Sequence, residues 1–296
     1  MSESRLINST IDCGDYCGDD NDSLERVDFI QVIEEQISDL EKQLMESLGL
    51  PSSFSSSKRL KKPKRKSKKS KIIGNNKNLC KYWNQRYRLF SRFDQGIELD
   101  EESWYSVTPE MIANHIACKC LKGEGAKIIM DPFCGVGGNV IQFALKSPNV
   151  FVIASDIDVN KVRMAKHNSR IYGVDNQIAF LVGDFFQIIE TIKFPVDCIF
   201  LSPPWGGPNY LHQNVYSLAN MRPNGFEIFR AAKEHVSSNI AFLLPRNIDR
   251  DELDSLLAPN ESLEIEQNLI NNKLKTVTSY FGNLVQIKTE TEEKET

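Results

Sequence analysis

The sequence predicts an α/β fold, with a mostly parallel, Rossmann-like sheet and helices on both faces. Three observations support this prediction. Five short apolar runs have the length and composition of strands buried on both faces, at 127–130, 151–154, 178–182, 196–201 and 240–244. Helical stretches such as 139–146 and 158–172 lie between them. Finally, 263–269 and 275–285 are rich in β-type residues with no helix between, which favours a closing antiparallel hairpin and seven strands in all.

The chain divides by composition into four segments. Residues 1–76 are expected to be a largely disordered tail, and 77–122 a small helical extension in which Thr108 caps a helix that has Pro109 at its first position. Residues 123–288 form the predicted α/β core, and 289–296 a short disordered tail. We therefore expect one folded domain that follows a long N-terminal tail.

The N-terminal tail carries two opposite charge blocks. Residues 1–57 are acidic, and the stretch 1–23, rich in Ser, Asp and Asn, lacks the apolar density that would offset the entropy of folding. Within 24–48 an apolar stripe has helical spacing, through Ile30, Ile33, Ile37, Leu40 and Leu44. This stripe is typical of a partly formed amphipathic helix, or of a short coiled coil or helix that docks a partner.

The basic run 58–71 cannot pack in a core. Dense Lys and Arg bind phosphate with release of counterions, so this run indicates a nuclear-import signal or a nonspecific contact with an RNA backbone. A solvated linker is the alternative. The formal net charge of −4 averages over both blocks and says little by itself.

Cysteine and histidine usage argues against a metal site. The seven cysteines have no paired ligand spacing and only four histidines could complement them, so we expect no metal and a reducing compartment. No apolar run approaches the ~20 residues that span a bilayer, and the acidic start differs from a signal peptide. A soluble, intracellular protein is expected.

Three successive strand ends carry side chains suited to a nucleoside. The Gly-rich turn Asp131-Pro132-Phe133-Cys134-Gly135-Val136-Gly137-Gly138 follows the first strand, and glycines there allow close approach to a ligand. Asp156 ends the second strand, where a carboxylate accepts ribose hydroxyls. Asp184 and Phe185 follow the third, suited to an adenine amine and ring. The alternative is that the glycines serve helix packing and the carboxylates cap helices. A dinucleotide site is disfavoured by the glycine spacing.

The fourth strand ends in Ser202-Pro203-Pro204-Trp205. Two prolines fix this loop at the sheet edge where α/β proteins bind ligands, and the aromatic ring is suited to hold a flat base. The alternative interpretation makes Trp205 a core aromatic and Ser202 a loop cap.

These motifs in this order resemble the class I S-adenosylmethionine-dependent methyltransferases. Within this class, three segments of the chain are similar to the trimethylguanosine synthase family of RNA cap guanine-N2 methyltransferases. These segments are Ser202 to Tyr210, Lys81-Tyr82-Trp83 to Phe93, and Trp104 to Glu110. The resemblance covers about residues 79–285. It implies two successive methyl transfers to the N2 amine of a 7-methylguanosine cap on small nuclear and nucleolar RNAs, with S-adenosylmethionine as co-substrate and no metal.

The resemblance also implies roles for individual residues. Ser202 and the carbonyl of Pro203 would orient the amine, and Trp205 would stack on the charged base. Phosphate or substrate contacts would come from Lys81, Asn209, Tyr210, Arg246 and Lys275, of which Arg246 also ends the fifth strand as a bidentate phosphate ligand. The donor would be held by Asp131, Cys134, Gly135, Asp156, Asp184 and Phe185, with Phe90 and Thr108 in the extension that closes the active site.

Two alternative functions share features of this site. One is another amino-group methyltransferase that acts on adenine or internal guanine of RNA or DNA, and the other is a noncatalytic cap-binding or scaffold protein. Ser202 and Trp205 differ from the Asn or Asp and the Tyr or Phe usual in adenine enzymes, and all three donor-site aspartates are present. We expect a monomeric core, a possible protein partner at helix 24–48, no membrane contact, and a nuclear location, nucleolar or Cajal-body-like, with cytoplasmic activity as an alternative.

Overall fold

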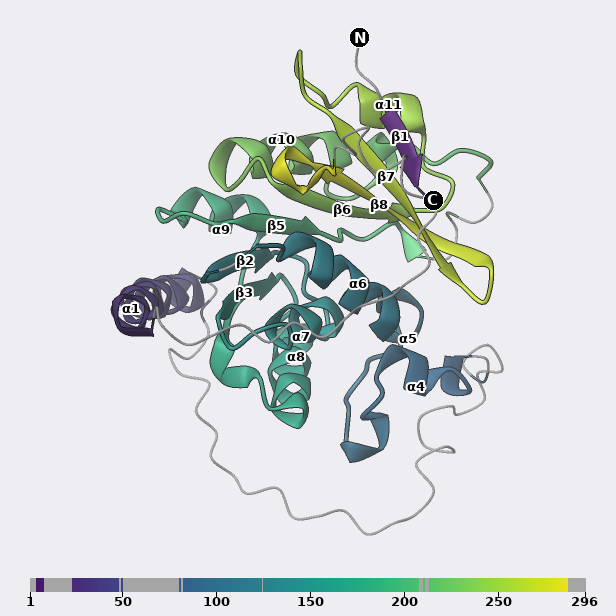
Figure 1. Cartoon of the computed structure of the whole chain (residues 1–296). Helices are drawn as coiled ribbons and strands as arrows, with labels where there is room; N and C mark the ends of the chain where they lie inside the picture. The colour runs from purple at the N-terminus through teal and green to yellow at the C-terminus, as the bar shows by residue number, and fades with distance from the viewer. Residues whose placement is uncertain are drawn as a thin grey trace, which may run out of the picture.

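Figure 1 shows the computed structural model, which describes residues 4–7, 23–47, 49, 80, 82–123, 125–207, 210 and 213–286. The basic run 58–71 and the tail 289–296 lie outside the described residues, as do Lys81 and Asn209.

The centre of the fold is one eight-stranded sheet with the order β1-β7-β8-β6-β5-β2-β3-β4. Its seven core strands are β2 (Lys127–Asp131), β3 (Val150–Asp156), β4 (Ile178–Val182), β5 (Cys198–Leu201), β6 (Ile240–Pro245), β7 (Leu263–Ile270) and β8 (Lys273–Phe281). Strands β2 to β6 pair in parallel, and β8 runs antiparallel to β6 and β7. The predicted parallel sheet with a C-terminal hairpin is confirmed.

Strand β2 sets the position of the site. It lies between β3 on one side and β5 on the other, so the chain order reverses across it. Ligands of open α/β sheets bind outside the carboxyl ends of the strands at such a reversal. The carboxyl ends of β2, β3, β4 and β5 carry the four predicted motifs, which the parallel strands therefore bring to one edge of the sheet.

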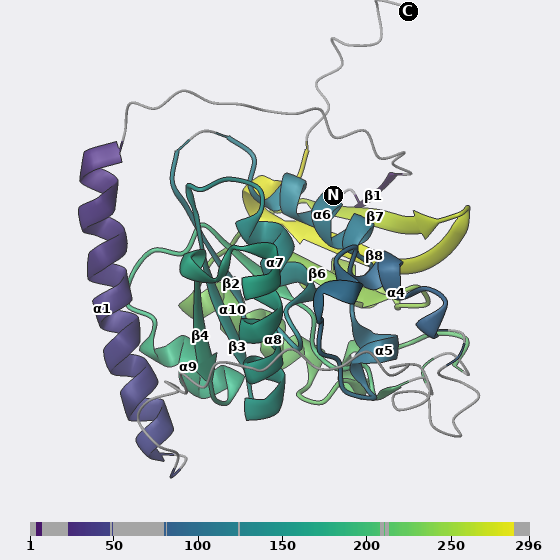
Figure 2. The same ribbon diagram turned by 90° about the horizontal axis from the view of Figure 1, so that it is seen from below.

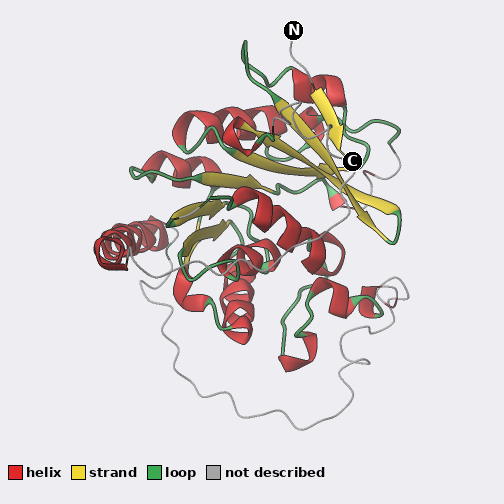
Figure 3. Ribbon diagram, in the orientation of Figure 1, coloured by secondary structure: helices red, strands yellow, loops and turns green. Residues whose placement is uncertain are grey.

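Helices cover both faces of the sheet, as Figure 3 shows. Alternating side chains of each strand enter two apolar clusters, with Ile129 and Phe200 in one and Met130 and Leu201 in the other. The first cluster is covered by α6 (Glu110–Cys120), α7 (Gly138–Ala144) and α8 (Val159–Tyr172). The second is covered by α9 (Phe185–Thr191), α10 (Gly225–His235) and α11 (Arg250–Asp254). The strands are continuous apolar runs in the sequence because both of their faces are covered.

The predicted capping of α6 by Thr108 is wrong. Pro109 stands at the N-cap position of α6 without a side-chain cap bond, and Thr108 Oγ1 instead accepts a hydrogen bond from Asn139 Nδ2 at 3.0 Å. Thr108 is buried, and its hydroxyl satisfies a side chain of α7 rather than a backbone N–H of its own helix.

The acidic tail contains structure that its composition does not indicate. Strand β1 (Ser4–Ile7) pairs in parallel with β7 at the edge of the sheet. Residues 1–76 are expected to be a largely disordered tail, and within it these four residues form a strand. A ladder of backbone hydrogen bonds to an exposed strand edge requires no apolar core of its own, and composition averaged over the segment does not reveal it.

The amphipathic stripe lies on α1 (Ser23–Ser47), a helix that runs along the edge of the sheet formed by β4 (Figure 2). Ile33, Ile37, Leu40 and Leu44 are buried in the second apolar cluster of this same chain. The stripe is thus covered by the protein's own core, so a partner that used these side chains would have to displace them.

The N-terminal extension consists of α4 (Arg86–Leu89), the 3-10 turn Phe93–Gln95 and α5 (Ser103–Ser106), which lie beside α6 in Figure 1. Glu110 Oε2 accepts hydrogen bonds from the N–H of Ser91 at 2.6 Å and from the hydroxyl of Tyr172 at 2.8 Å. Asn168 Nδ2 donates to the carbonyl of Glu98 at 2.9 Å. These bonds join the extension to α8 and to the core.

The face between α6 and β7 contains buried charge. Lys119 of α6 forms an ion pair with Glu264, and His115 Nε2 lies 2.7 Å from Glu266 Oε1. The hydroxyl of Tyr280 donates to Glu266 Oε2 at 3.0 Å. Each buried carboxylate therefore has a partner from α6, which fixes that helix against the C-terminal hairpin.

No helix in the described portion of the chain is long and apolar enough to cross a membrane.

Candidate active site

The turn after β2 is bonded to the end of β3. The N–H of Cys134 donates to the carbonyl of Ser155 at 2.9 Å, and the N–H of Gly135 donates to Asp156 Oδ2 at 3.0 Å. Gly137 has φ 92°, and a Cβ there would lie 3.2 Å from Ala165 of α8. The glycine is required because the turn is left-handed at this point and passes close to a neighbouring helix.

Asp131 ends β2 as a fully buried carboxyl group. Its Oδ1 accepts the N–H of Phe133 at 3.2 Å, and its Oδ2 is buried with no hydrogen-bond partner in the described structure. Burial raises the pKa of Asp131 to about 8, the N–H of Phe133 acts in the opposite direction, and nearby Asp156 raises it further. A buried, unpartnered carboxylate oxygen beside a Gly-rich turn is suited to a cationic or N–H group of a ligand.

Asp156 links three strand ends. Its carboxylate accepts from Gly135 N and, at 2.9 Å, from Asp158 N, while its carbonyl accepts the N–H of Gly183 beyond β4 at 3.1 Å. Burial raises the pKa of Asp156, and the N–H groups of Asp158 and Gly135, together with Lys161, act in the opposite direction. The structure therefore brings Asp131, Gly135 and Asp156 together at one place, as the sequence predicts.

Asp184 and Phe185 differ from their expected arrangement. Asp184 caps α9, with Oδ1 accepting from Phe186 N at 2.9 Å, so the capping interpretation holds for this oxygen. Phe185 is 3% exposed, and its ring packs against that of Phe133 at 5.2 Å between centroids. Phe133 is the more exposed ring of the pair.

Ile157 is a candidate that sequence reasoning missed. It directly follows Asp156 and is 71% exposed, although it is a large apolar residue. An exposed apolar side chain beside a ribose-type carboxylate is suited to cover a purine ring. The signal in the sequence was its place between two aspartates at the end of a strand, where solvent would normally favour a polar residue.

Two further predicted donor residues are buried. Burial raises the pKa of the Cys134 thiol well above its usual value, with Asp156 and Asp131 adding to the effect, so the group stays uncharged. Phe90 is 2% exposed, and its ring lies 6.4 Å from that of Tyr172 in the first apolar cluster. Phe90 thus packs the extension onto the core, whereas Thr108 contacts the start of α7 through Asn139.

The loop after β5 lies against the Gly-rich turn. Ser202 Oγ donates to the carbonyl of Phe133 at 3.3 Å, and Pro203 is buried. Because the hydroxyl hydrogen of Ser202 is used in this bond, the lone pairs of Oγ remain available to accept a hydrogen bond from a ligand. The acceptor loop and the donor turn are therefore in direct contact.

Trp205 is half-buried, and its ring is bordered by tyrosines. The ring of Tyr210 meets it edge-on at 5.3 Å, and Tyr210 in turn meets Tyr216 edge-on at 6.2 Å. The hydroxyl of Tyr216 donates to the carbonyl of Trp205 at 3.1 Å. Trp205 Nε1 is buried without a hydrogen-bond partner within the described structure. These contacts fix the indole at the rim of both apolar clusters.

Two predicted phosphate-binding cations, Arg246 and Lys275, lie at one end of the sheet. Arg246 directly follows β6 and is exposed. Burial raises the pKa of Tyr210, and the positive charge of Arg246 acts in the opposite direction. Lys275 is exposed on β8 next to Thr276, which pairs with Pro245 at the end of β6. The register of β6 and β8 thus places Arg246 and Lys275 at the same end of the sheet. The two other predicted contacts, Lys81 and Asn209, are outside the described residues.

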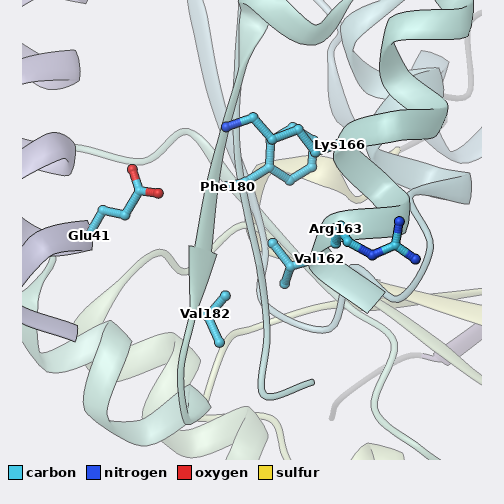
Figure 4. Close-up of a pocket in the computed structure, with 6 residues that line it drawn as sticks. All are labelled: Glu41, Val162, Arg163, Lys166, Phe180 and Val182. Carbon is cyan, nitrogen blue, oxygen red and sulfur yellow. The ribbon is translucent and has the colours of Figure 1, made fainter. Parts of the chain in front are cut away.

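A cavity of about 270 Å³ lies away from these residues, between α1, α8 and β4. Figure 4 shows the smaller pocket beside it, where Lys166 of α8 extends toward the side of Glu41 of α1 and the guanidinium of Arg163 points away from Glu41. Neither space contains a predicted site residue. Among the described residues, no three His, Cys, Asp or Glu side chains are grouped as metal ligands.

The fold and the three linked strand ends define the class of protein as a class I S-adenosylmethionine-dependent methyltransferase. A solved structure of a putative methyltransferase from Porphyromonas gingivalis W83 has this fold, with a TM-score of 0.55 and 16% identity over 75% of this chain and 55% of that chain.

The chain belongs to the RNA cap guanine-N2 methyltransferase family, whose sequence model matches residues 126–284. It is 42% identical to trimethylguanosine synthase of Schizosaccharomyces pombe over 210 residues. The matched region is 70% of this chain and 87% of that relative. The chain is 39% identical over 192 residues to trimethylguanosine synthase of Saccharomyces cerevisiae, covering 62% and 59%. The family resemblance of the sequence motifs is confirmed.

The residues present fit S-adenosylmethionine. This donor has a cationic sulfonium and ammonium, a ribose and an adenine. The unpartnered Oδ2 of Asp131 suits a cationic group, Asp156 suits the ribose, and Ile157 and Phe133 offer apolar surface to the adenine.

Proposed function

We propose that this protein transfers two methyl groups in sequence to the exocyclic N2 amine of a 7-methylguanosine RNA cap, giving 2,2,7-trimethylguanosine. The observation that carries the proposal is the contact between Ser202 Oγ and the carbonyl of Phe133. It joins a loop suited to hold a flat base directly to the turn suited to hold the methyl donor.

The acceptor amine decides what the protein must do. Its lone pair is conjugated with the guanine ring, so it is a weak nucleophile, whereas the bound donor supplies a methyl group already activated by its sulfonium. In transfer, the nitrogen forms a bond to the methyl carbon as the carbon–sulfur bond breaks, and the nitrogen then loses a proton to solvent. Orientation of the amine is the main contribution of the protein, and no strong base is required.

Ser202, Pro203 and Trp205 supply this orientation. The lone pairs of Ser202 Oγ and the carbonyl of Pro203 would accept the amine hydrogens and direct its lone pair at the methyl group. The indole of Trp205 would stack on the base, and 7-methylguanine is positively charged. A cation–π contact of about 2 kcal/mol when desolvated favours the N7-methylated base over guanine. Arg246 and Lys275 would bind the cap phosphates at the adjoining sheet end.

A methyl-transfer assay tests this proposal. The full chain is incubated with labelled S-adenosylmethionine and either a 7-methylguanosine-capped dinucleotide or the same dinucleotide without the N7 methyl. We expect labelled dimethylated product from the first and at least about tenfold lower kcat/KM for the second. Equal activity on both would contradict the cap assignment, and activity on uncapped RNA or DNA alone would favour the internal-guanine or adenine alternative.

Variants at Trp205 separate stacking from donor binding. We expect Trp205→Ala to lower kcat/KM by about 100-fold or more, because the base is no longer aligned, while the affinity for S-adenosylmethionine is nearly unchanged. Trp205→Phe keeps a smaller aromatic face and should retain intermediate activity. Full activity of Trp205→Ala would remove the stacking argument, and lack of donor binding by every form would favour the noncatalytic alternative.

The substrate RNAs and the location of the protein belong to this proposal. Capped small nuclear and nucleolar RNAs and a nuclear location are supported by the family and by the basic run 58–71. A fluorescent fusion with and without residues 58–71 tests the location, since loss of nuclear accumulation is expected only when the run is deleted.

A further inference from the structure

Tyr216 joins the acceptor loop to the core of the protein. Its side chain is 1% exposed and lies within the second apolar cluster. Its hydroxyl donates to the carbonyl of Trp205 at 3.1 Å, and its ring meets that of Tyr210 edge-on at 6.2 Å. One buried side chain therefore contacts both aromatic residues of the loop, the first at its backbone and the second at its ring.

The backbone of Tyr216 is bonded to the segment that follows β6. The N–H of Tyr216 donates to the carbonyl of Asn247 at 2.7 Å, and the N–H of Asp249 donates to the carbonyl of Tyr216 at 2.9 Å. These two bonds form a parallel bridge between Tyr216 and Ile248. Because Asn247 directly follows Arg246, Tyr216 is attached to the end of the sheet that carries this predicted phosphate ligand.

The side chain of Asn247 makes a second connection to the acceptor loop. Its Nδ2 donates to the carbonyl of Tyr210 at 3.2 Å and to the carbonyl of Gln213 at 2.9 Å. If Nδ2 and Oδ1 exchanged places, the amide oxygen would face two carbonyl oxygens with no hydrogen between them. The two bonds therefore set the orientation of the amide and hold the loop on both sides of it.

The segment after Tyr216 is also fixed. The hydroxyl of Ser217 donates to Glu252 Oε1 at 2.6 Å, and the N–H of Leu218 donates to Glu252 Oε2 at 2.6 Å. Glu252 belongs to α11, which packs on the second apolar cluster through Leu253. The frame to which Tyr216 attaches the loop is thus part of the packed core.

We propose that Tyr216 and Asn247 are positioning residues through which phosphate binding at Arg246 raises kcat instead of only lowering KM. The inference rests on the proposed function and deepens it, because it states how the phosphates of the acceptor contribute to methyl transfer. Binding energy from a part of the substrate that does not react can align the reacting part only if the two subsites keep a fixed separation. The bonds of Tyr216 and Asn247 fix the separation between Trp205 and Arg246.

Kinetics with two acceptors test the proposal: 7-methylguanosine and 7-methylguanosine triphosphate, each at saturating concentration. For the unmodified protein we expect kcat to be about tenfold higher for the triphosphate, and KM to be lower. If turnover of the nucleoside is too slow to measure, the 5′-monophosphate takes its place. The readout is the ratio of the two kcat values, in which any loss shared by both acceptors cancels.

Tyr216→Phe keeps the buried ring and removes only the hydroxyl. We expect the kcat ratio to fall close to one, because the base is no longer held at a fixed distance from the phosphates. The triphosphate should still have the lower KM, since Arg246 is intact, and the affinity for S-adenosylmethionine measured by calorimetry should be unchanged. Asn247→Leu, of similar size but without the amide, should change the ratio in the same direction.

Tyr280→Phe is the matched control. It also removes a buried tyrosine hydroxyl, which donates to Glu266 Oε2 at 3.0 Å. Tyr280 pairs with Ala241 of β6, whereas Pro245 next to Arg246 pairs with Thr276, so Tyr280 lies toward the opposite end of that strand. We expect this variant to keep the kcat ratio of the unmodified protein, even where its stability is lower.

The outcomes separate the inference from the proposed function. The inference is wrong if the unmodified protein has equal kcat for both acceptors, or if Tyr216→Phe keeps the unmodified ratio. It is also wrong if Tyr280→Phe lowers the ratio as much as Tyr216→Phe does, because the effect would then be one of stability. If Asn247→Leu fails to bind the donor, it is misfolded and Tyr216→Phe decides alone. Failure of the unmodified protein to methylate either acceptor contradicts the proposed function itself.

Discussion

The N–H of Gly135 donates to Asp156 Oδ2 at 3.0 Å, across the 21 residues that separate them in the chain. This bond holds the turn after β2 against the end of β3. Asp131 lies one strand away, where it is paired in register with Ala154. The buried carboxyl group of Asp131 and the half-buried one of Asp156, each with a raised pKa, are therefore held close together at the edge of the sheet. A bound cationic donor would favour the ionised form of both groups.

Donor binding should depend on pH through Asp131. Its pKa of about 8 lies above the ordinary value of 3.8, so the folded protein holds the carboxyl protonated near neutrality. A cationic donor favours the carboxylate and releases this proton. We expect the affinity for S-adenosylmethionine to rise up to about tenfold per pH unit between about pH 6 and pH 8. Calorimetry in buffers of different ionisation enthalpy should show proton release near neutral pH, and its absence would contradict this role.

Asp131 should also make stability depend on pH. Because its folded pKa is raised, its contribution to the free energy of unfolding is fully present below about pH 4 and is lost as the pH rises through about 8. Asp131→Asn removes this titration, so relative to the unmodified protein it should become more stable with rising pH. Urea unfolding of both forms without donor at about pH 5 and pH 8 measures the difference. Identical pH profiles for the two forms would refute the assignment.

The ion pair between Lys119 and Glu264 should be costly to break from one side. Both side chains are buried, the Lys119 ammonium lies 4.1 Å over the ring of Tyr280, and Glu264 Oε2 accepts the N–H of Gln286 at 2.9 Å. Lys119→Met leaves an unpaired buried carboxylate and should lower the free energy of unfolding by about 3–5 kcal/mol. The double variant Lys119→Met, Glu264→Gln should recover much of this loss. A double variant no more stable than the single one would show that the lost stability is not due to the unpaired charge.

Helix α1 should contribute to global stability. Ile37 is 4% exposed in the second apolar cluster, and Gln36 beside it is exposed. Ile37→Ala should lower the free energy of unfolding by about 2 kcal/mol or more, whereas Gln36→Ala should change it by less than about 0.5 kcal/mol. Denaturant unfolding of the full chain measures both. Equal, small effects would mean that α1 does not belong to the cooperative unit.

Gly137→Ala should weaken both the fold and donor binding. The left-handed backbone costs about 1–2 kcal/mol for any L-residue, and the new methyl group would also press on Ala165 at 3.2 Å. Gly173→Ala is the control, because Gly173 is also left-handed but has open space around it. We expect Gly137→Ala to be the less stable of the two in thermal unfolding and to raise the dissociation constant for the donor. Equal stability would show that α8 yields to the methyl group.

Most of the core and of its site could be predicted from local pattern. Continuous apolar runs become buried parallel strands, and residues that directly follow such strands meet at one edge, so Asp131, Asp156 and Ser202 could be assigned to one site. Side chains whose role depends on distant partners could not. Thr108 has the local form of a helix cap, but Asn139 of another helix takes its hydroxyl. Phe185 has the form of an exposed covering ring, but Phe133 packs over it.

By itself the sequence determined the class of fold, the family and the strand ends that carry the site, because these depend on periodicity and on motifs whose spacing is short. Tertiary structure alone decided that α1 packs on the protein's own core, that β1 joins the sheet at β7, and that Thr108 is bonded to Asn139 of α7. Each of these brings together residues far apart in the chain. Such contacts are set by the shape of the whole packed core, which no local pattern encodes.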